Sequence, residues 1–390
     1  TGAVYEKKGK VKLIPWDRYE GDCILMRYGE ENGVKHNILV DGGVYVNNKD
    51  VAAIIEYAYS NNEKIDILIT HIDGDHIQGF ISGLSMVESA KLKACISTIY
   101  FNNHRDIVKN LKLSEVSDKG AGDIIRVPVY DDDGYSVSEA KTLLEILKDK
   151  GIENKIDGFV TMGRNIEIAG AILNIISPSE KELKKLAIEW EKELELEDRI
   201  VTGYAAENPN QIDIDELMNI RFPAADSSIF NRASIGFLFN YKDVRIAFLG
   251  DASAPVLCKG LKSYGINDLI KVDAIKLSHH GSGRNISKKL LSLLETNIYM
   301  LSTNGDALKK RQSLPWKITI SKILQNRIKE RVYLLNNYSW WETCYYNRFF
   351  TERDKENYIN TGKLCLCNVY EQKYTVKEGL RIYGNWYNNR

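Results

Sequence analysis

Two short motifs in this chain gather side chains that can bind a metal ion and activate water. The first places four ligand-type residues within six positions: His71, Asp73, Asp75 and His76. The second is the pair His279 and His280, so these motifs hold four of the six histidines. Imidazole and carboxylate groups are the usual ligands of catalytic divalent cations. The two motifs therefore predict a metal site that supports hydrolysis.

Each motif directly follows a predicted buried strand. The apolar run 65–70 precedes the first motif, and the run 274–277 precedes the histidine pair. A third run, 244–249, ends in Gly250 and Asp251. Because strand ends hold side chains rigidly, we expect these three distant segments to meet at one site. For the first motif we expect a loop turned by Gly74, with a helix only from Ile77.

Strand and helix patterns alternate along most of the chain, which predicts an α/β fold. Short apolar runs predict strands at 11–14, 23–27 and 37–40, and residues 50–58 predict a helix. We expect a catalytic domain over residues 1–330, in which 180–230 form an insertion or lid. Residues 331–390 are rich in Tyr and Trp and predict a small β-rich C-terminal addition. Trp340 and Trp341 fit a packed core or, alternatively, a surface that stacks bases.

Composition excludes several classes of protein. The 390 residues carry 53 Lys and Arg against 53 Asp and Glu, so the chain has no net charge. Nucleic acid would therefore have to bind through a local patch. No apolar run approaches the roughly 18 residues of a membrane helix, so we expect no membrane contact. The six cysteines form no CxxC pair, which favours reduced thiols and a cytoplasmic location.

Five motifs together resemble the signature of the metallo-β-lactamase fold. In chain order they are Gly21-Asp22, Val40-Asp41-Gly42-Gly43, Thr70-His71-x-Asp73-x-Asp75-His76, Leu249-Gly250-Asp251-Ala252 and Lys276-x-x-His279-His280-Gly281-Ser282. The set is most similar to the soluble metallo-hydrolase domain of ComEC-type DNA-uptake proteins, and Asn231-x-x-Ser234 also fits that subgroup. The resemblance covers about residues 10–305. It implies a four-layer αβ/βα sandwich, in which two sheets pack face to face with helices outside.

The resemblance also implies a set of metal ligands. His71 and Asp73 would hold one ion, a second ion would be held by Asp75, His76 and His280, and Asp251 would bridge the two. The sequence departs from the family where a further histidine is expected, because only His104 is available there. A surface role for His104 is an equal interpretation. A carboxylate ligand such as Asp73 suits Mn²⁺ or Mg²⁺. Two metal compositions are therefore compatible with the site: one Zn²⁺ with a more weakly bound Mn²⁺, or two Zn²⁺.

The expected chemistry is hydrolysis by a metal-activated hydroxide, because a bound divalent cation lowers the pKa of water towards roughly 7. Asp75 is predicted to orient the water or take its proton. His279 is predicted to protonate the leaving group or, alternatively, to hold a ligand in place. The predicted substrate-binding residues are Lys276, Ser282, Asn231 and Ser234. Arg232 and Arg284 lie nearby, and such groups favour a phosphodiester substrate.

Three functions are compatible with these residues. The first hypothesis is a nuclease or phosphodiesterase that acts on DNA, and the family resemblance suggests a bacterial defence effector activated by a regulatory protein partner. The alternative is a small-molecule hydrolase, such as a lactonase, thioesterase or β-lactamase. A non-enzymatic binding module is the third, and the complete set of His and Asp ligands argues against it.

Overall fold

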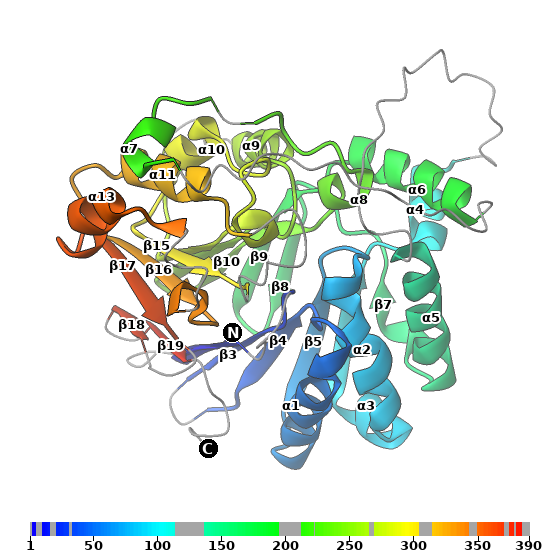
Figure 1. Cartoon of the computed structure of the whole chain (residues 1–390). Helices are drawn as coiled ribbons and strands as arrows, with labels where there is room; N and C mark the ends of the chain where they lie inside the picture. Colours follow the sequence, from blue (N-terminus) through cyan, green and yellow to red (C-terminus); the bar gives the residue numbers. More distant parts are fainter. Residues whose placement is uncertain are drawn as a thin grey trace.

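The structure is a computed structural model of the chain (Figure 1). It describes residues 2–4, 10–15, 21–30, 33–113, 136–194, 212–221, 223–264, 269–303, 314–342, 349–369, 374–377 and 380–383. Part of the expected insertion or lid, residues 195–211 and 222, lies outside the described residues.

Among the described residues, one sheet has nine strands in the order β18-β19-β1-β2-β3-β4-β5-β6-β7. Its strands are β1 (Gly2–Val4), β2 (Lys10–Pro15), β3 (Ile24–Gly29), β4 (His36–Val40), β5 (Lys64–Ile69), β6 (Ile96–Phe101), β7 (Ile156–Asp157), β18 (Tyr374–Lys377) and β19 (Leu380–Tyr383). The pairing changes from antiparallel to parallel after β4, since β4, β5, β6 and β7 run in parallel.

The second sheet has eight described strands in the order β17-β16-β15-β13-β11-β10-β9-β8. They are β8 (Asn165–Ile168), β9 (Ala171–Ser177), β10 (Gly236–Tyr241), β11 (Val244–Phe248), β13 (Ala274–Lys276), β15 (Ile298–Leu301), β16 (Val332–Asn336) and β17 (Leu364–Asn368). From β11 onward the neighbours are parallel, as in the first sheet. A small separate pair joins β12 (Ile270–Lys271) to β14 (Leu294–Glu295).

Helices cover the outer face of each sheet, and Figure 1 shows the two groups on opposite sides of the strands. The first group is α1 (Asn48–Ser60), α2 (Gly74–Met86), α3 (Ser89–Cys95), α4 (His104–Leu111), α5 (Ser136–Asp149) and α6 (Glu180–Leu194). The second includes α7 (Ile214–Leu217), α9 (Ala254–Ser263), α10 (Lys288–Leu293) and α11 (Lys317–Asn326). Shorter helical segments are α8 (Ile229–Arg232), α13 (Glu352–Asp354), η1 (Tyr45–Asn47), η2 (Glu153–Lys155), η4 (Ser278–Gly281), η5 (Trp340–Glu342) and η6 (Lys355–Ile359).

Three clusters of buried apolar residues hold the structure together. They arise because successive side chains of a strand point to opposite faces of the sheet. Side chains two positions apart point to one face of a strand. In β10, Phe237 and Phe239 therefore enter the core between the sheets, whereas Leu238 packs against the helices. In β5, Leu68 enters the core between the sheets and Ile67 faces the first helix group. The observed fold is thus the expected four-layer αβ/βα sandwich, with both sheets covered on both faces.

The C-terminal residues add strands to both sheets. β16 and β17 extend the second sheet, whereas β18 and β19 pair beside β1 in the first. Trp340 is fully buried in the core of the second sheet with Phe349 and Phe350, so this side chain packs and does not offer a stacking surface. Among the described helices, none combines the length and the apolar character needed to cross a membrane.

Candidate metal centre

The first ligand motif spans a short connection and the start of a helix. His71 and Asp73 lie between β5 and α2, and α2 begins at Gly74. The expectation of a loop turned by Gly74, with a helix only from Ile77, was therefore wrong. Asp75 and His76 project from the first helical turn instead, where consecutive side chains diverge by about 100°. This divergence lets the two neighbours reach different partners.

The Asp41-Gly42-Gly43 turn fixes the start of α2. The amide of Gly42 donates to the carbonyl of His76 at 2.7 Å, and the amide of Gly79 donates to the carbonyl of Gly43 at 2.9 Å. A Cβ atom on Gly79 would lie 1.8 Å from the carbonyl oxygen of Gly42. Only glycine allows this close approach, so the end of β4 sets the position of His76.

A second glycine turn positions Asp251 after β11. Gly250 has φ of +50°, and a Cβ there would lie 2.4 Å from the hydroxyl oxygen of Ser234. That same hydroxyl oxygen accepts a 3.0 Å hydrogen bond from the amide of Asp251. Ser234 is itself fully buried, so its role is to hold the Asp251 turn.

The histidine pair has an unusual backbone. His279 and His280 both adopt left-handed conformations, with φ of +47° and +48°. Such conformations cost non-glycine residues of order 1 kcal/mol each and cluster at functional sites. The amide of His279 donates to the carbonyl of Gly250 at 3.1 Å, which ties the pair to the Asp251 turn. The expected meeting of three distant segments is therefore observed.

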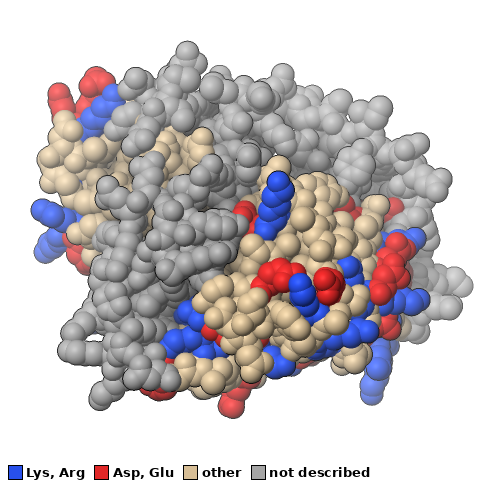
Figure 2. All heavy atoms as spheres, turned by 90° about the horizontal axis from the view of Figure 1, so that it is seen from below, with Lys and Arg blue, Asp and Glu red and all other residues tan. Residues whose placement is uncertain are grey.

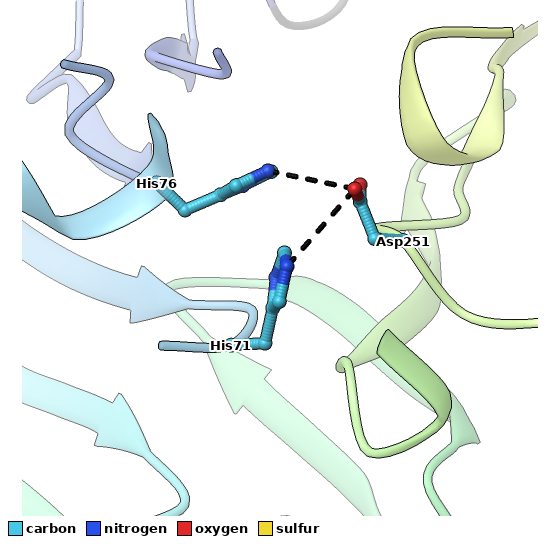
Figure 3. A group of neighbouring side chains, drawn as sticks. All are labelled: His71, His76 and Asp251. Carbon is cyan, nitrogen blue, oxygen red and sulfur yellow. Dashed lines mark ion pairs between the residues drawn. The ribbon is translucent and has the colours of Figure 1, made fainter. Parts of the chain in front are cut away.

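Figure 3 shows the imidazoles of His71 and His76 turned towards the carboxylate of Asp251. Nε2 of His71 lies 4.0 Å from Oδ2 of Asp251, and Nε2 of His76 lies 3.7 Å from it. Both of these nitrogens and Oδ1 of Asp251 are buried and have no hydrogen-bond partner. Buried polar atoms are rarely left unpaired. When several ligand atoms each lie about 2.0–2.2 Å from a zinc ion, they are separated from one another by distances close to those observed between these three residues. This group therefore fits a divalent cation.

A second group faces the same space. Nε2 of His280 lies 3.0 Å from Oδ2 of Asp75, and Nε2 of His76 lies 3.6 Å from that oxygen. Nε2 of His76 belongs to both groups and can bind only one ion. Asp73 contacts His71 at 3.2 Å, and its Oδ1 is also buried without a partner. The division of these ligands between a first and a second ion stays a prediction.

Hydrogen bonds on the far side of each ring leave the Nε2 atoms available. The carbonyl of Ser302 can only accept, so Nδ1 of His280 donates to it at 2.7 Å. The Thr70 hydroxyl donates its one proton to Asp41 at 2.7 Å and can therefore accept from Nδ1 of His71 at 3.0 Å. Such contacts fix the tautomer and orientation of metal-binding histidines.

The electrostatics of the site suit a cation. Burial alone would raise the pKa of Asp251, but the nearby imidazoles of His279, His76 and His71 hold it well below its ordinary value. Burial would lower the pKa of His76, but Asp75, Asp251 and Asp41 raise it well above its ordinary value. Protons on the imidazoles thus balance the carboxylates in the metal-free protein. A divalent cation would replace these protons, so metal binding releases them.

Asp226 is a site residue that the sequence reasoning missed. Its Oδ2 lies 3.4 Å from Nδ1 of His279 and accepts hydrogen bonds from the side-chain amides of Asn231 and Asn285 at 2.8 and 3.1 Å. Burial would raise the pKa of Asp226, but the contact with His279 lowers it. Asp226 follows no predicted strand and lies in a stretch with weak periodicity, so no signal in the sequence marked it.

The four predicted substrate-binding residues are all buried in the structure. Nζ of Lys276 donates to Oδ2 of Asp22 at 2.7 Å, and both side chains are shielded from solvent. Asn231 donates to Asp226, and Ser234 supports Asp251. The Ser282 hydroxyl accepts from the amide of Arg284 at 3.3 Å. These contacts hold the site in shape, and a role for the four residues in substrate binding stays a prediction.

His104 lies apart from these ligand groups. Its Nε2 is 3.0 Å from Oε1 of Glu191 on α6, and its ring faces Trp190. None of the three candidate ligand groups among the described residues includes it.

Comparisons with known proteins give only distant likenesses. No protein-family model and no curated protein matches the chain. Among solved structures, a CmlA beta-hydroxylase mutant is 11% identical with a TM-score of 0.31, covering 81% of this chain and 44% of its own. Zn²⁺-bound PqqB from Methylobacterium extorquens is 11% identical with a TM-score of 0.36, covering 88% and 84%. A protein of unknown function from Enterococcus faecalis V583 is 7% identical with a TM-score of 0.30, covering 71% and 49%.

These likenesses are too weak to indicate a shared activity. The chain also spans less than half the length of the CmlA and Enterococcus chains. The four-layer sandwich, in which the ligand motifs follow strand ends, agrees with the metallo-β-lactamase fold inferred from the sequence. The narrower resemblance to ComEC-type domains stays a prediction.

Proposed function

We propose that this protein is a metal-dependent hydrolase that cleaves phosphodiester bonds, with DNA as its substrate. One observation carries the proposal. Ligand atoms of His71, His76 and Asp251 lie within 4.8 Å of one another, and Nε2 of His76 and Oδ1 of Asp251 are buried without hydrogen-bond partners. Unpaired buried groups are costly unless a ligand satisfies them. These three residues, with Asp73, Asp75 and His280 beside them, would hold one or two ions of Zn²⁺ or Mn²⁺.

A divalent cation, when bound, lowers the pKa of water and polarises an ester oxygen. Residues of the chain supply the proton transfers. The solvent exposure of their side chains distinguishes these residues from the buried metal ligands. Asp75 and His279 have side-chain exposures of 33% and 29%, whereas those of His71, His76 and Asp251 are at most 3%. Solvent therefore reaches Asp75 and His279 in preference to these ligands. This supports Asp75 as the group that orients a water molecule or accepts its proton.

His279 is suited to donate a proton to the leaving oxygen. Burial would lower its pKa, but the carboxylates of Asp251, Asp226 and Asp75 raise it to about 10. Its Nδ1 faces Asp226 and the side-chain oxygen of Asn285, so Nε2 is the nitrogen directed at the centre. A protonated imidazole held in this way can donate from Nε2 to an alkoxide as it leaves.

Metal analysis combined with a substrate panel tests the proposal. Purified protein would be loaded with Zn²⁺, Mn²⁺ or Mg²⁺ and assayed on bis(p-nitrophenyl) phosphate, DNA, a chromogenic ester, a lactone and a lactam. The proposal expects phosphodiester cleavage that is lost in Asp75→Ala. Cleavage of only the ester, lactone or lactam would establish the small-molecule alternative instead. No hydrolysis with any of the ions would overturn the proposal.

The biological setting rests on the sequence resemblance alone. A role as a bacterial defence effector, with a regulatory protein partner, follows from the likeness to free-standing ComEC-type relatives. We retain it as part of the proposal. A partner would then be needed for cleavage of DNA but not of bis(p-nitrophenyl) phosphate, so cleavage of DNA by the purified chain alone would argue against such activation.

A further inference from the structure

A recess lies where α9 and the start of α10 come together. It is a pocket of about 580 Å³ bordered by Lys259 and Lys262 of α9, by Arg284, and by Lys289 of α10. Pro255 and Ile286 contribute apolar wall. A volume in this range suits a nucleotide-sized group more than a single small ion.

The pocket is built on the same segments that carry the site residues. α9 begins three residues after Asp251, and Arg284 follows His280 by four residues. The carbonyl oxygen of Arg284 accepts a 3.1 Å hydrogen bond from the amide of Asp226, whose carboxylate contacts His279. The pocket is therefore connected to the leaving-group side of the centre through one hydrogen bond and one side chain.

Charge in this pocket has a single sign. Four of its lining residues are cationic and none is acidic. The three lysines are exposed, and none of the four cations forms an ion pair with an acidic residue in the described part of the chain. Figure 2 shows a different pattern on the face that it presents, where Lys, Arg, Asp and Glu are intermingled over the described surface. In a chain without net charge, such a local excess is the feature that can attract a polyanion.

We infer that Lys259, Lys262, Lys289 and Arg284 bind backbone phosphates of a polynucleotide strand, next to the phosphodiester bond that lies at the metal centre. The inference rests on the proposed function and adds the path that the strand follows. Arginine can bind a phosphate with two parallel hydrogen bonds, and the lysines supply mobile point charges. Lys259 and Lys262 are three positions apart on α9, so they lie on one face of the helix.

The inference is tested by reversing the charge of the pocket and measuring DNA binding. The variant is Lys259→Glu/Lys262→Glu/Lys289→Glu, placed in the Asp75→Ala background so that the strand is not cut. The matched control, Lys141→Glu/Lys148→Glu/Lys329→Glu, changes the net charge equally at exposed lysines elsewhere. Fluorescence anisotropy with a single strand of about 20 nucleotides would be measured over a range of salt concentrations. Thermal melting checks that both variants are folded.

Loss of three phosphate contacts should weaken binding by about tenfold or more. It should also reduce the magnitude of the slope of log K against log salt concentration by about 2. The control variant should keep the affinity and most of the slope of its parent. Equal losses in both variants would overturn the inference, because they would show only the effect of total charge. If charge reversal unfolds the protein, Lys262→Ala and Lys289→Ala replace it, and unchanged binding in both would overturn the inference.

Failure of the proposed function is distinguishable from failure of this inference. If the wild type cleaves bis(p-nitrophenyl) phosphate but the pocket variant binds DNA as its parent does, the function stands and the phosphate path is wrong. If the wild type cleaves no phosphodiester but the pocket variant selectively loses DNA binding, the path stands and the proposed reaction is wrong.

Discussion

Oδ2 of Asp41 lies 2.8 Å from Nδ1 of His76, and neither side chain is exposed to solvent. The same carboxylate accepts hydrogen bonds from the amide and the hydroxyl of Thr70, each at 2.7 Å. Asp41 therefore connects the end of β4 to two other elements. It contacts Thr70, directly after β5, and His76, in the first turn of α2. Because a carboxylate accepts and does not donate, the contact places the proton of His76 on Nδ1 and leaves Nε2 for a metal ion.

Replacing this carboxylate should weaken metal binding. In Asp41→Asn the negative charge beside His76 is lost, and the ring is held less firmly in the tautomer that binds metal. We expect the affinity for Zn²⁺ to fall by about 10- to 100-fold, the usual effect of removing such a partner. Competition with a chromogenic chelator measures the affinity, and Asp149→Asn at an exposed position is the control. An unchanged affinity would show that Asp41 only stabilises the turn.

Asp226 is expected to position His279 without binding metal. In Asp226→Asn, hydrolysis of a small phosphodiester should slow by at least about tenfold in kcat, while metal content and KM change little. Removing the carboxylate should lower the pKa of His279 from about 10, so the loss of activity at high pH should begin at a lower pH. Metal analysis and a pH–rate profile measure both effects. A loss of metal equal to the loss of activity would contradict this role.

How far the sequence predicts the site depends on where each residue lies relative to a strand. The end of β5 was predictable because a continuous apolar run stops there, and His71 follows at once. The same pattern located Asp251 and His280. Asp226 was not predictable, because it follows no strand and reaches His279 only through tertiary structure. The start of α2 was misplaced because Gly74 favours a turn by local propensity, whereas contacts with the Asp41-Gly42-Gly43 turn stabilise a helix there.

The burial of Lys276 was not predictable from the sequence for a related reason. A lysine beside a histidine motif is usually exposed, since burying an ammonium group is costly without a partner. Here the partner is Asp22, which lies 254 positions earlier in the chain. Asp22 belongs to the Gly21-Asp22 motif, one of the five that resemble the metallo-β-lactamase signature. Nothing in the local sequence pattern connected it to Lys276. Contacts of this kind become visible only when the two sheets are packed together.

The Lys276–Asp22 pair should be needed for stability and not for substrate affinity. In Lys276→Met the carboxylate of Asp22 stays buried without its cation, which typically costs about 3–5 kcal/mol. The control is Lys271→Met, whose 3.8 Å contact with Glu295 involves an 84% exposed lysine and should cost less than about 1 kcal/mol. Urea denaturation measures both values. A raised KM with unchanged stability would restore Lys276 as a substrate-binding group.

Asp66 gives a prediction for pH that does not depend on a metal ion. It lies on β5, on the same face as Leu68, and its side chain is buried between the sheets. Burial raises its pKa from 3.8 to about 6, although hydrogen bonds from Thr98 oppose the shift. The folded state therefore favours the protonated acid. Its contribution to stability is complete below the unfolded pKa of 3.8 and is lost as the pH rises through 6.

Asp66→Asn should remove this dependence, because an amide cannot ionise yet keeps an oxygen that accepts from Thr98. The unfolding free energy of the variant, relative to wild type, should rise between about pH 4 and about pH 7 by up to roughly 3 kcal/mol. Urea denaturation at several pH values, in the presence of a chelator, measures the difference. Asp149→Asn, at an exposed position, should show no such trend. If the difference for Asp66→Asn stayed constant with pH, the carboxyl group would be ionised in the folded protein, and water or a cation would have to reach it between the sheets.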